Sequence, residues 1–366
     1  MSRAQLTSTV EQNTGGAVAP APAGKNRIIN GAMEISQRGT SFTPTTDSTY
    51  TLDRWIARLT AASKYSVQQV SNSSTFVGFQ NYLAVTSLAA TTVNSTDFYT
   101  INQYIEWQGW SDAAWGTSSA KPVTLSFWVQ SSLTGTFGGS IWSYGSDANY
   151  PFTYSIPVAN TPTKISITIP GATAGTWNIT NGGSVVVNFG LGVGSSFTGP
   201  AGAWVYGSYT RGANGAVNVV STNGATWYIT GVQLELGSSS TPFARAAGTF
   251  QGELALCQRY YYQTYNGATY IAPGALRTTT TGYCSFKFPV TMRTTPTAAF
   301  ASGGSFQWIG ITAGGTSVSS LAVDVVSPDS LGISVTNSSA GSNTAGSGGT
   351  LYGATAPCWI SVSAEL

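Results

Sequence analysis

The sequence predicts an all-β protein: a jelly-roll β-sandwich followed by a second, smaller β-sandwich, with an extended N-terminal arm. Short segments in which every second residue is apolar recur along the chain, separated by Gly, Ser, Asn and Pro. This period of two is typical of half-buried antiparallel strands. Between Arg27 and Phe243 no segment of helix length repeats apolar residues at helical spacing, which excludes a parallel βαβ topology.

The first predicted element is an arm over residues 1–24. It ends in GGAVAPAPAG and has no hydrophobic periodicity, so we expect an extended segment that attaches to other proteins. Its beginning, MSRAQLTSTVEQNTGG, lacks the apolar stretch of a secretory signal.

Residues 25–247 form the predicted jelly roll. Many short strands joined by Gly-rich turns are typical of a sandwich. Three strands have clear inward-facing sets: Val123, Leu125, Phe127 and Val129; Ile165, Ile167 and Ile169; and Val185, Val187, Phe189, Leu191 and Val193.

A domain boundary is predicted within 229–262. The strand that begins near Trp227 changes its inward-facing phase at Gly231, which indicates a β-bulge, and it ends at Gly237. The segment GELALCQRYYY then predicts a short helix, because Leu254, Cys257 and Tyr261 lie at helical spacing.

Residues 248–366 form the second predicted β-sandwich. The strand pattern resumes there in three clear sets: Cys284, Phe286, Phe288 and Val290; Leu321, Val323 and Val325; and Cys358, Ile360 and Val362. A domain of this size can hold about seven strands.

The composition excludes several classes of function. Charged residues make up 8% of the chain and the net charge is +2, without a basic run, so we expect no nucleic-acid partner. No apolar stretch is long enough for a membrane helix. The absence of histidine removes the usual Ser-His-Asp and Cys-His systems and every His-ligated metal site. The three cysteines form no metal knuckle or disulfide framework and are expected to be buried.

Several motifs resemble a module of bacteriophage tail-fibre and minor structural proteins. They are KNRIINGAMEISQRGTSF at 25–42, YTLDRW at 50–55 and WYITGVQLELG with TPF and Arg245 at 227–245; ELALCQRYYY at 253–262 and FKFPVTMRTTPT at 286–297 resemble the module that commonly follows. The resemblance implies a virion protein with a carbohydrate-module-like jelly roll, trimeric assembly and binding to the host surface. It transfers no catalytic residue. Ala244 departs from the acidic residue that this family often carries, which leaves the angle between the domains open.

The shared motifs also have a structural interpretation. Asn30 and Gly31 are expected to form a turn, and Trp55 and Leu234 to lie in the core.

Candidate glycan contacts come from aromatic residues outside the clean strand patterns. Flat rings stack on sugar rings, while amides and carboxylates bind the hydroxyl groups. Core filling is the simpler interpretation of the tryptophans. In the C-terminal domain, the polar loop at 336–353 is a candidate receptor contact or a plain mobile loop. The candidates are Trp107, Trp110, Trp115, Trp308 and Tyr352.

We expect a non-enzymatic tail fibre or adhesin that binds a host-surface glycan, with no cofactor. The expected partners are further copies of the chain, other virion proteins through residues 1–24, and the glycan. The protein would be made in the host cytoplasm and reside in the virion.

The alternatives are a capsid or tail decoration protein and a polysaccharide depolymerase, which needs two facing carboxylates. Calcium at an Asp/Asn loop stays open, although no EF-hand ligand run exists. The acidic pairs close in sequence are Asp47 with Asp53, Glu106 with Asp112, and Asp324 with Asp329.

Overall fold

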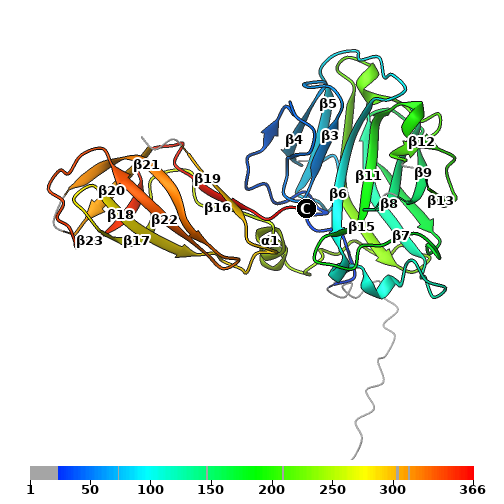
Figure 1. Cartoon of the computed structure of the whole chain (residues 1–366). Helices are drawn as coiled ribbons and strands as arrows, with labels where there is room; N and C mark the ends of the chain where they lie inside the picture. The colour runs from blue at the N-terminus through cyan, green and yellow to red at the C-terminus, as the bar shows by residue number, and fades with distance from the viewer. Residues whose placement is uncertain (1–23, 73, 146, 208–209, 302–304, 312–313) are drawn as a thin grey trace, which may run out of the picture.

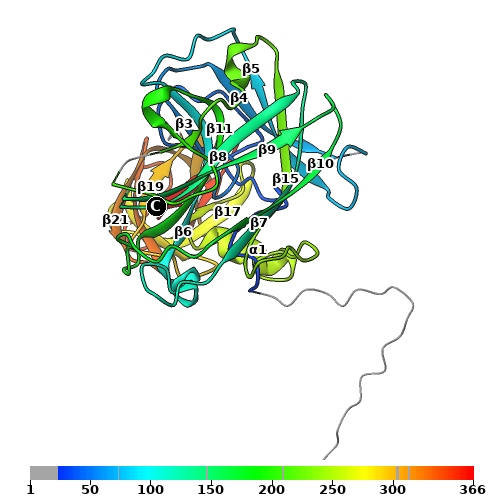
Figure 2. The ribbon, with the colours of Figure 1, turned by 90° about the vertical axis from the view of Figure 1, so that its right-hand side faces the viewer.

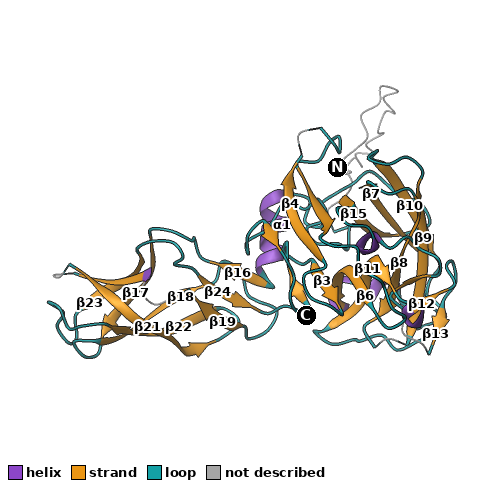
Figure 3. Cartoon of the chain, turned by 90° about the horizontal axis from the view of Figure 1, so that it is seen from above, coloured by secondary structure: helices purple, strands orange, loops and turns teal. Residues whose placement is uncertain are grey.

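The computed structural model describes residues 24–366 except 73, 146, 208–209, 302–304 and 312–313. Two β-rich lobes lie on either side of α1 (Phe250–Gln258), which is the one α-helix in this part of the chain (Figures 1 and 3). The all-β class is therefore confirmed. The predicted attachment arm lies outside the described residues, apart from Gly24.

The N-terminal lobe is built on two antiparallel sheets, and Figure 2 shows it in front of the other lobe. The six-stranded sheet has the order β1 (Ser41–Phe42), β4 (Tyr65–Ser71), β5 (Asn81–Ser87), β15 (Thr226–Leu236), β7 (Val123–Ser131) and β10 (Thr163–Ile169). The seven-stranded sheet has the order β13 (Val205–Tyr206), β9 (Ala148–Ile156), β8 (Gly135–Ser143), β11 (Gly183–Val193), β6 (Phe98–Glu106), β3 (Ile56–Leu59) and β2 (Thr49–Tyr50). A short parallel pair, β12 (Thr198–Gly199) with β14 (Gly212–Ala213), lies beside them.

The inward-facing sets of the predicted strands line one core between these sheets. Every residue predicted to face inward in β7 is buried, and so are those in β11 up to Leu191. In β10 only Ile169 is fully buried, because this strand lies at the edge of its sheet. Burial of large side chains such as Trp55 and Leu234 contributes about 1.5–3 kcal/mol each, so the alternating pattern drives this fold.

The predicted bulge at Gly231 is present. The register of β15 on β7 shifts between Thr230 and Gln233, and Gly231 has a φ of +61°. A Cβ atom there would lie 2.4 Å from the ring of Phe79, so both the backbone and the packing require glycine.

The Asn30–Gly31 turn is also present. Asn30 has a φ of +58°, and its amide binds the backbone of Ile35 and the carbonyl oxygen of Asp53. A Cβ atom on Gly31 would lie 2.1 Å from the carbonyl oxygen of Val232. This motif therefore acts as a folding signal.

Helix α1 is shorter than the sequence pattern suggests. Thr249 caps its first turn by accepting a hydrogen bond from the backbone N–H of Gly252. The helix ends at Gln258, and Tyr261 already belongs to β16 (Tyr261–Gln263). Cys257 is buried, as predicted, whereas Leu254 is only partly buried.

The C-terminal lobe has two sheets around a separate core. One contains β16, β24 (Ile360–Ser363) and β19 (Thr297–Phe300). The other closes into a barrel of β17 (Thr269–Leu276), β18 (Thr281–Lys287), β22 (Ser330–Asn337), β21 (Gly315–Val326), β20 (Phe306–Gly310) and β23 (Gly348–Gly353). Pairing of β17 with β23 closes the barrel, so the predicted sandwich has a more closed form. The boundary at 247/248 itself stays a prediction.

The predicted inward set of β21 is wrong in part. Leu321 is partly buried, but Val323 and Val325 are exposed. Register shifts occur between Val318 and Ser320 and again between Val323 and Val325, so alternation along this strand does not map onto one face.

Candidate functional site

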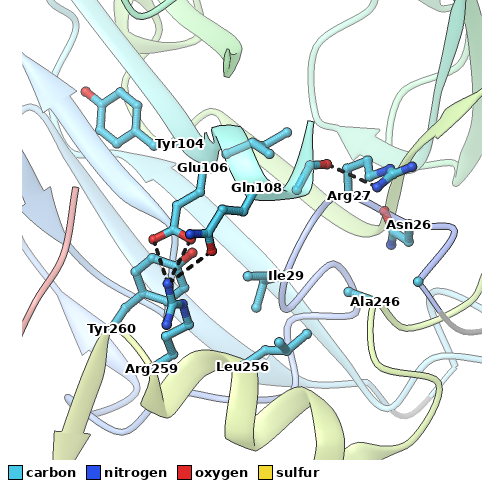
Figure 4. Close-up of a pocket in the computed structure, with 13 residues that line it drawn as sticks. Asn26, Arg27, Ile29, Tyr104, Glu106, Gln108, Ala246, Leu256, Arg259 and Tyr260 are labelled. Carbon is cyan, nitrogen blue, oxygen red and sulfur yellow. Dashed lines mark hydrogen bonds and ion pairs between the residues drawn. The ribbon is translucent and has the colours of Figure 1, made fainter. Parts of the chain in front are cut away.

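A cavity of about 340 Å³ lies between the N-terminal lobe and α1 (Figure 4). We call it the junction cavity. Its walls come from the segment before the first strand, the end of β6, the 3₁₀ turn Trp107–Gly109, the linker before α1, and the end of α1. The lining residues are Gly24, Asn26, Arg27, Ile29, Tyr104, Ile105, Glu106, Gln108, Gly109, Ala246, Leu256, Arg259 and Tyr260.

Local hydrogen bonds fix the cavity walls. The amide of Asn26 donates to the carbonyl oxygens of Val232 and Ala244, which ties the first wall to β15 and to the linker. The backbone N–H of Arg259 bonds to the last turn of α1, and its carbonyl oxygen accepts from Arg293 in the C-terminal lobe. A contact from the C-terminal lobe therefore holds the end of α1 that lines the cavity.

Two charged residues of the cavity, Arg259 and Glu106, are loosely paired. Nη2 of Arg259 contacts Glu106 at 3.3 and 3.5 Å and Gln108 at 3.5 Å (Figure 4). Nε of Arg293 lies 3.8 Å from Glu106 on another side. Burial raises the pKa values of Tyr104 and Tyr260, so both phenols are neutral near pH 7. The cavity thus offers a mixture of ring surface, hydrogen-bond donors and one carboxylate.

A second set of charges lies beside the cavity, around Glu365. Glu365 bridges Arg54 and Arg38 of the N-terminal lobe. The guanidinium of Arg54 also stacks on the ring of Tyr260, 3.5 Å from its centroid. Arg293 donates to the carbonyl oxygen of Glu365 at 3.0 Å. We call these five residues the junction latch.

The predicted acidic pairs are occupied by other contacts. Asp47 binds Arg58 at 2.8 Å, and buried Asp53 accepts from Gln37 and lies 3.7 Å from Arg38. Burial raises the pKa of Asp53.

Neither of the other two acidic pairs places its two carboxylates on opposite sides of the junction cavity. Asp112 binds Arg27 at 2.5 Å and does not line the cavity with Glu106. Asp329 accepts a hydrogen bond from Thr291, while Asp324 lies on the barrel surface. In the described part of the chain, no group of three His, Cys, Asp or Glu residues is placed to hold a metal ion. No helix in that part is long and apolar enough to cross a membrane.

The candidate contacts Trp110 and Trp115 are core residues, which corrects their assignment. Their rings lie 4.6 Å apart, and Trp115 also packs against Trp177 and Trp204. Because both are buried, neither has a free face for a sugar. Trp107 is partly exposed beside the junction cavity and packs on the same core, so it stays a candidate.

Trp308 is also a core residue, which is a second correction. It is fully buried inside the barrel. The alternate residues of this stretch face the other way, and the last of them, Ile311, just after β20, is 81% exposed. The sequence pattern shows that one of these two faces is buried but not which. Tyr352 is partly exposed, and its ring centroid lies 5.1 Å from that of Tyr270, which is 70% exposed.

A shallow groove crosses the outer surface of the barrel over β17, β18, β22 and β21. We call it the barrel groove; its volume is about 300 Å³. Tyr283, which is 40% exposed, stands at one wall, and Asp324 and Val325 at another. Gly274 and Gly332 also line the groove. The remaining lining residues are Pro273, Cys284 and Ser285.

Sequence reasoning missed both sites. Tyr283 does show a signal, because it lies in the outward phase beside the inward-facing Cys284. The contact of Arg259 with Glu106 joins residues 153 positions apart, so no local sequence pattern predicts it.

Comparisons with known proteins give no family. No family model and no curated protein matches the chain. Among solved structures, the enzymatically active domain of bacteriophage CBA120 tailspike protein 4 is 15% identical, with a TM-score of 0.33. That match covers 58% of this chain and 21% of the tailspike chain, so this protein spans about a fifth of it.

Two carbohydrate-binding modules are similar at the same level. TmCBM61 in complex with β-1,4-galactotriose is 10% identical over 58% of this chain and 99% of its own, with a TM-score of 0.30. The family 11 module from Clostridium thermocellum, in complex with a mixed-linked tetrasaccharide, is 14% identical over 55% and 97%, with a TM-score of 0.26. These weak likenesses assign no family, ligand or activity.

Proposed function

We propose that this protein is a non-enzymatic component of a bacteriophage particle, a tail fibre or adhesin, that binds host-surface glycan through its C-terminal lobe. The observation that carries the proposal is the barrel groove. It combines an exposed aromatic ring, Tyr283, with the carboxylate of Asp324 and the hydroxyl of Ser285. An apolar ring face with a few polar groups around it is the arrangement that recognises a sugar.

The surface around the groove supports the same function. Along the outer face of β17, Tyr270 and Pro273 extend the aromatic and apolar surface from the groove toward Tyr352. With only 8% charged residues, the chain is suited to neutral polar partners, which are bound through hydrogen bonds and ring stacking.

Weak single sites become effective through repetition. Stacking of one ring is worth about 0.5–1.5 kcal/mol beyond area burial, or roughly 2- to 10-fold in affinity. A trimer, repeated around a virion, raises the effective concentration of the groove at a glycan-coated surface. In this proposal residues 1–24 join the protein to other virion proteins, and the protein is made in the host cytoplasm before assembly.

The test compares the full chain with Tyr283→Ala, added to host cells before the phage. We expect the full chain to slow adsorption of the phage and Tyr283→Ala to do so several-fold less effectively. Tyr206→Ala is the matched control, because Tyr206 is 44% exposed but lies in the N-terminal lobe. Equal loss in both variants would show that the groove is not the contact.

A chain truncated after residue 247 separates the proposal from its alternatives. If neither the full chain nor this truncation binds cells, even after multimerisation, the protein is better described as a decoration protein. Release of reducing sugar ends from host polysaccharide would instead identify a depolymerase, and the non-enzymatic proposal would be wrong.

A further inference from the structure

The two lobes are connected twice, although the chain crosses between them in one linker. Residues 237–249 lead from β15 into α1 and the C-terminal lobe. Two domains that share one linker usually move relative to each other unless a further interface holds them. Here the chain also returns: after β24, residues 364–366 lie against the N-terminal lobe (Figure 1). We call Ala364, Glu365 and Leu366 the strap.

The strap is held on the N-terminal lobe by three kinds of contact. The carboxylate of Glu365 forms ion pairs with Arg54 and, at 2.9 Å, with Arg38. The hydroxyl group of Tyr50 donates to the carbonyl oxygen of Leu366 at 2.8 Å. The side chain of Leu366 packs on an apolar cluster on the outer face of the seven-stranded sheet. The members of this cluster are Ile56, Tyr104, Trp142 and Val186.

The strap is held equally on the other side of the junction. The backbone N–H of Ala364 donates to the carbonyl oxygen of Tyr260 at 2.7 Å, at the end of α1. Arg293 of the C-terminal lobe donates to the carbonyl oxygens of Ala364 at 2.8 Å and Glu365 at 3.0 Å. Because β24 ends at Ser363, the strap follows its sheet directly and moves with the C-terminal lobe.

Two further contacts join the lobes at other places. Arg293 and Asn181, just before β11, exchange hydrogen bonds: Nη1 of Arg293 donates to the carbonyl oxygen of Asn181 at 2.6 Å, and Nδ2 of Asn181 donates to that of Arg293 at 2.7 Å. The buried carboxylate of Glu253 in α1 accepts from the backbone N–H groups of Asn30 at 2.5 Å and Ala247 at 3.1 Å. Contacts at separate places oppose rotation about the linker in more than one direction.

We propose that the strap, together with the Arg293–Asn181 contact, joins the two lobes into one rigid body. The barrel groove then keeps a fixed direction relative to the N-terminal lobe. Ala244 does not set the angle between the lobes, because its backbone is bonded to Gln233 and Asn26 within the N-terminal lobe. The proposal concerns the connection alone and does not depend on what the barrel groove binds.

The test measures the distances between two spin labels by pulsed electron paramagnetic resonance on the frozen full chain. Ser118→Cys labels the N-terminal lobe and Ala322→Cys the barrel; both positions are exposed, whereas the native cysteines are buried. Ser118→Cys with Thr222→Cys gives the width of the distribution within one lobe. We expect the pair across the junction to be as narrow as this pair.

A cut variant removes the connection and leaves the linker. It combines Leu366→Ala and Arg293→Ala with Arg54→Met and Glu365→Ala, which together leave no uncompensated buried charge. Glu106 keeps Arg259 as a partner. The distribution across the junction should widen at least about twofold, because one linker allows the lobes to move. The control Asp112→Ala cuts an ion pair within the N-terminal lobe and should leave the width unchanged.

Two results would overturn the proposal. One is a distribution across the junction of the unaltered connection that is wider than that within the lobe, a comparison that needs no cut variant. The other is an unchanged width in the cut variant with both lobes folded, as checked by thermal melting. Leu366→Ala alone removes no charge and should widen the distribution in the same direction. Tyr283→Ala should leave the width unchanged, so this outcome is separate from the proposed adhesion.

Discussion

Glu365→Ala should destabilise the protein strongly, although the residue is the last but one in the chain. Its carboxylate is the ion-pair partner of Arg54, whose side chain is only 1% exposed. Burial by itself disfavours the charged guanidinium, but the carboxylate of Glu365 more than offsets this, so the pKa of Arg54 is raised. Without Glu365 the guanidinium stays charged and buried with no carboxylate against it.

The expected loss of stability depends on which partners Arg38 and Arg54 keep in the Glu365→Ala variant. Arg38 retains Asp53 at 3.7 Å and the ring of Tyr261, so its loss is small. Arg54 retains the carbonyl oxygen of Tyr104 and the ring of Tyr260, neither of which carries a full charge. Removing one partner of a buried ion pair costs about 3–5 kcal/mol. We expect the free energy of unfolding to fall by that amount.

Urea denaturation followed by tryptophan fluorescence measures this loss. The control is Asp112→Ala, which breaks the pair with Arg27; Asp112 is 50% exposed, so the expected cost is about 1 kcal/mol or less. In the double variant Arg54→Met with Glu365→Ala, part of the loss should be recovered, because no uncompensated charge remains. If Glu365→Ala costs no more than Asp112→Ala, the junction latch does not stabilise the protein as argued.

Three further outcomes follow from the geometry. Gly231→Ala should cost roughly 1–3 kcal/mol in urea denaturation, because a φ of +61° and the Phe79 ring both oppose a Cβ atom; a cost near zero would contradict this. Burial by itself raises the pKa of Glu235, but hydrogen bonds from Lys25 and from the linker more than offset this, so its pKa is lowered. Its contribution to stability is therefore present above pH 4.5 and is lost as the pH falls below that value, so urea midpoints of Glu235→Gln should depend less on pH. Trp308→Ala should destabilise the barrel by about 3–5 kcal/mol; an unchanged melting temperature with lost glycan binding would refute its assignment to the core.

The sequence predicted much of the fold because local patterns carried it. Alternation along β7 and β11 identified their inward faces, since one face of each strand must be buried. The phase change at Gly231 identified the bulge, because a register shift leaves a trace in the order of apolar residues. The number and spacing of the cysteines predicted that Cys257, Cys284 and Cys358 are buried, and all three are buried free thiols.

The candidate sites were less predictable, because exposure depends on partners far away in the chain. Trp110 and Trp308 lie in stretches whose local pattern does not tell a core ring from a binding platform. Val323 and Val325 look like core residues until the register shifts of β21 turn them outward.

By itself, the sequence determined an all-β protein with little charge and no histidine chemistry, because composition and the period of two are properties of the chain alone. Tertiary structure decided that the C-terminal strands close into a barrel and that the barrel groove lies outside it. It also brought Arg259 to Glu106 and Glu365 to Arg54, pairs separated by 153 and 311 positions. Such long-range contacts depend on how the two lobes pack, and local sequence patterns do not predict that packing.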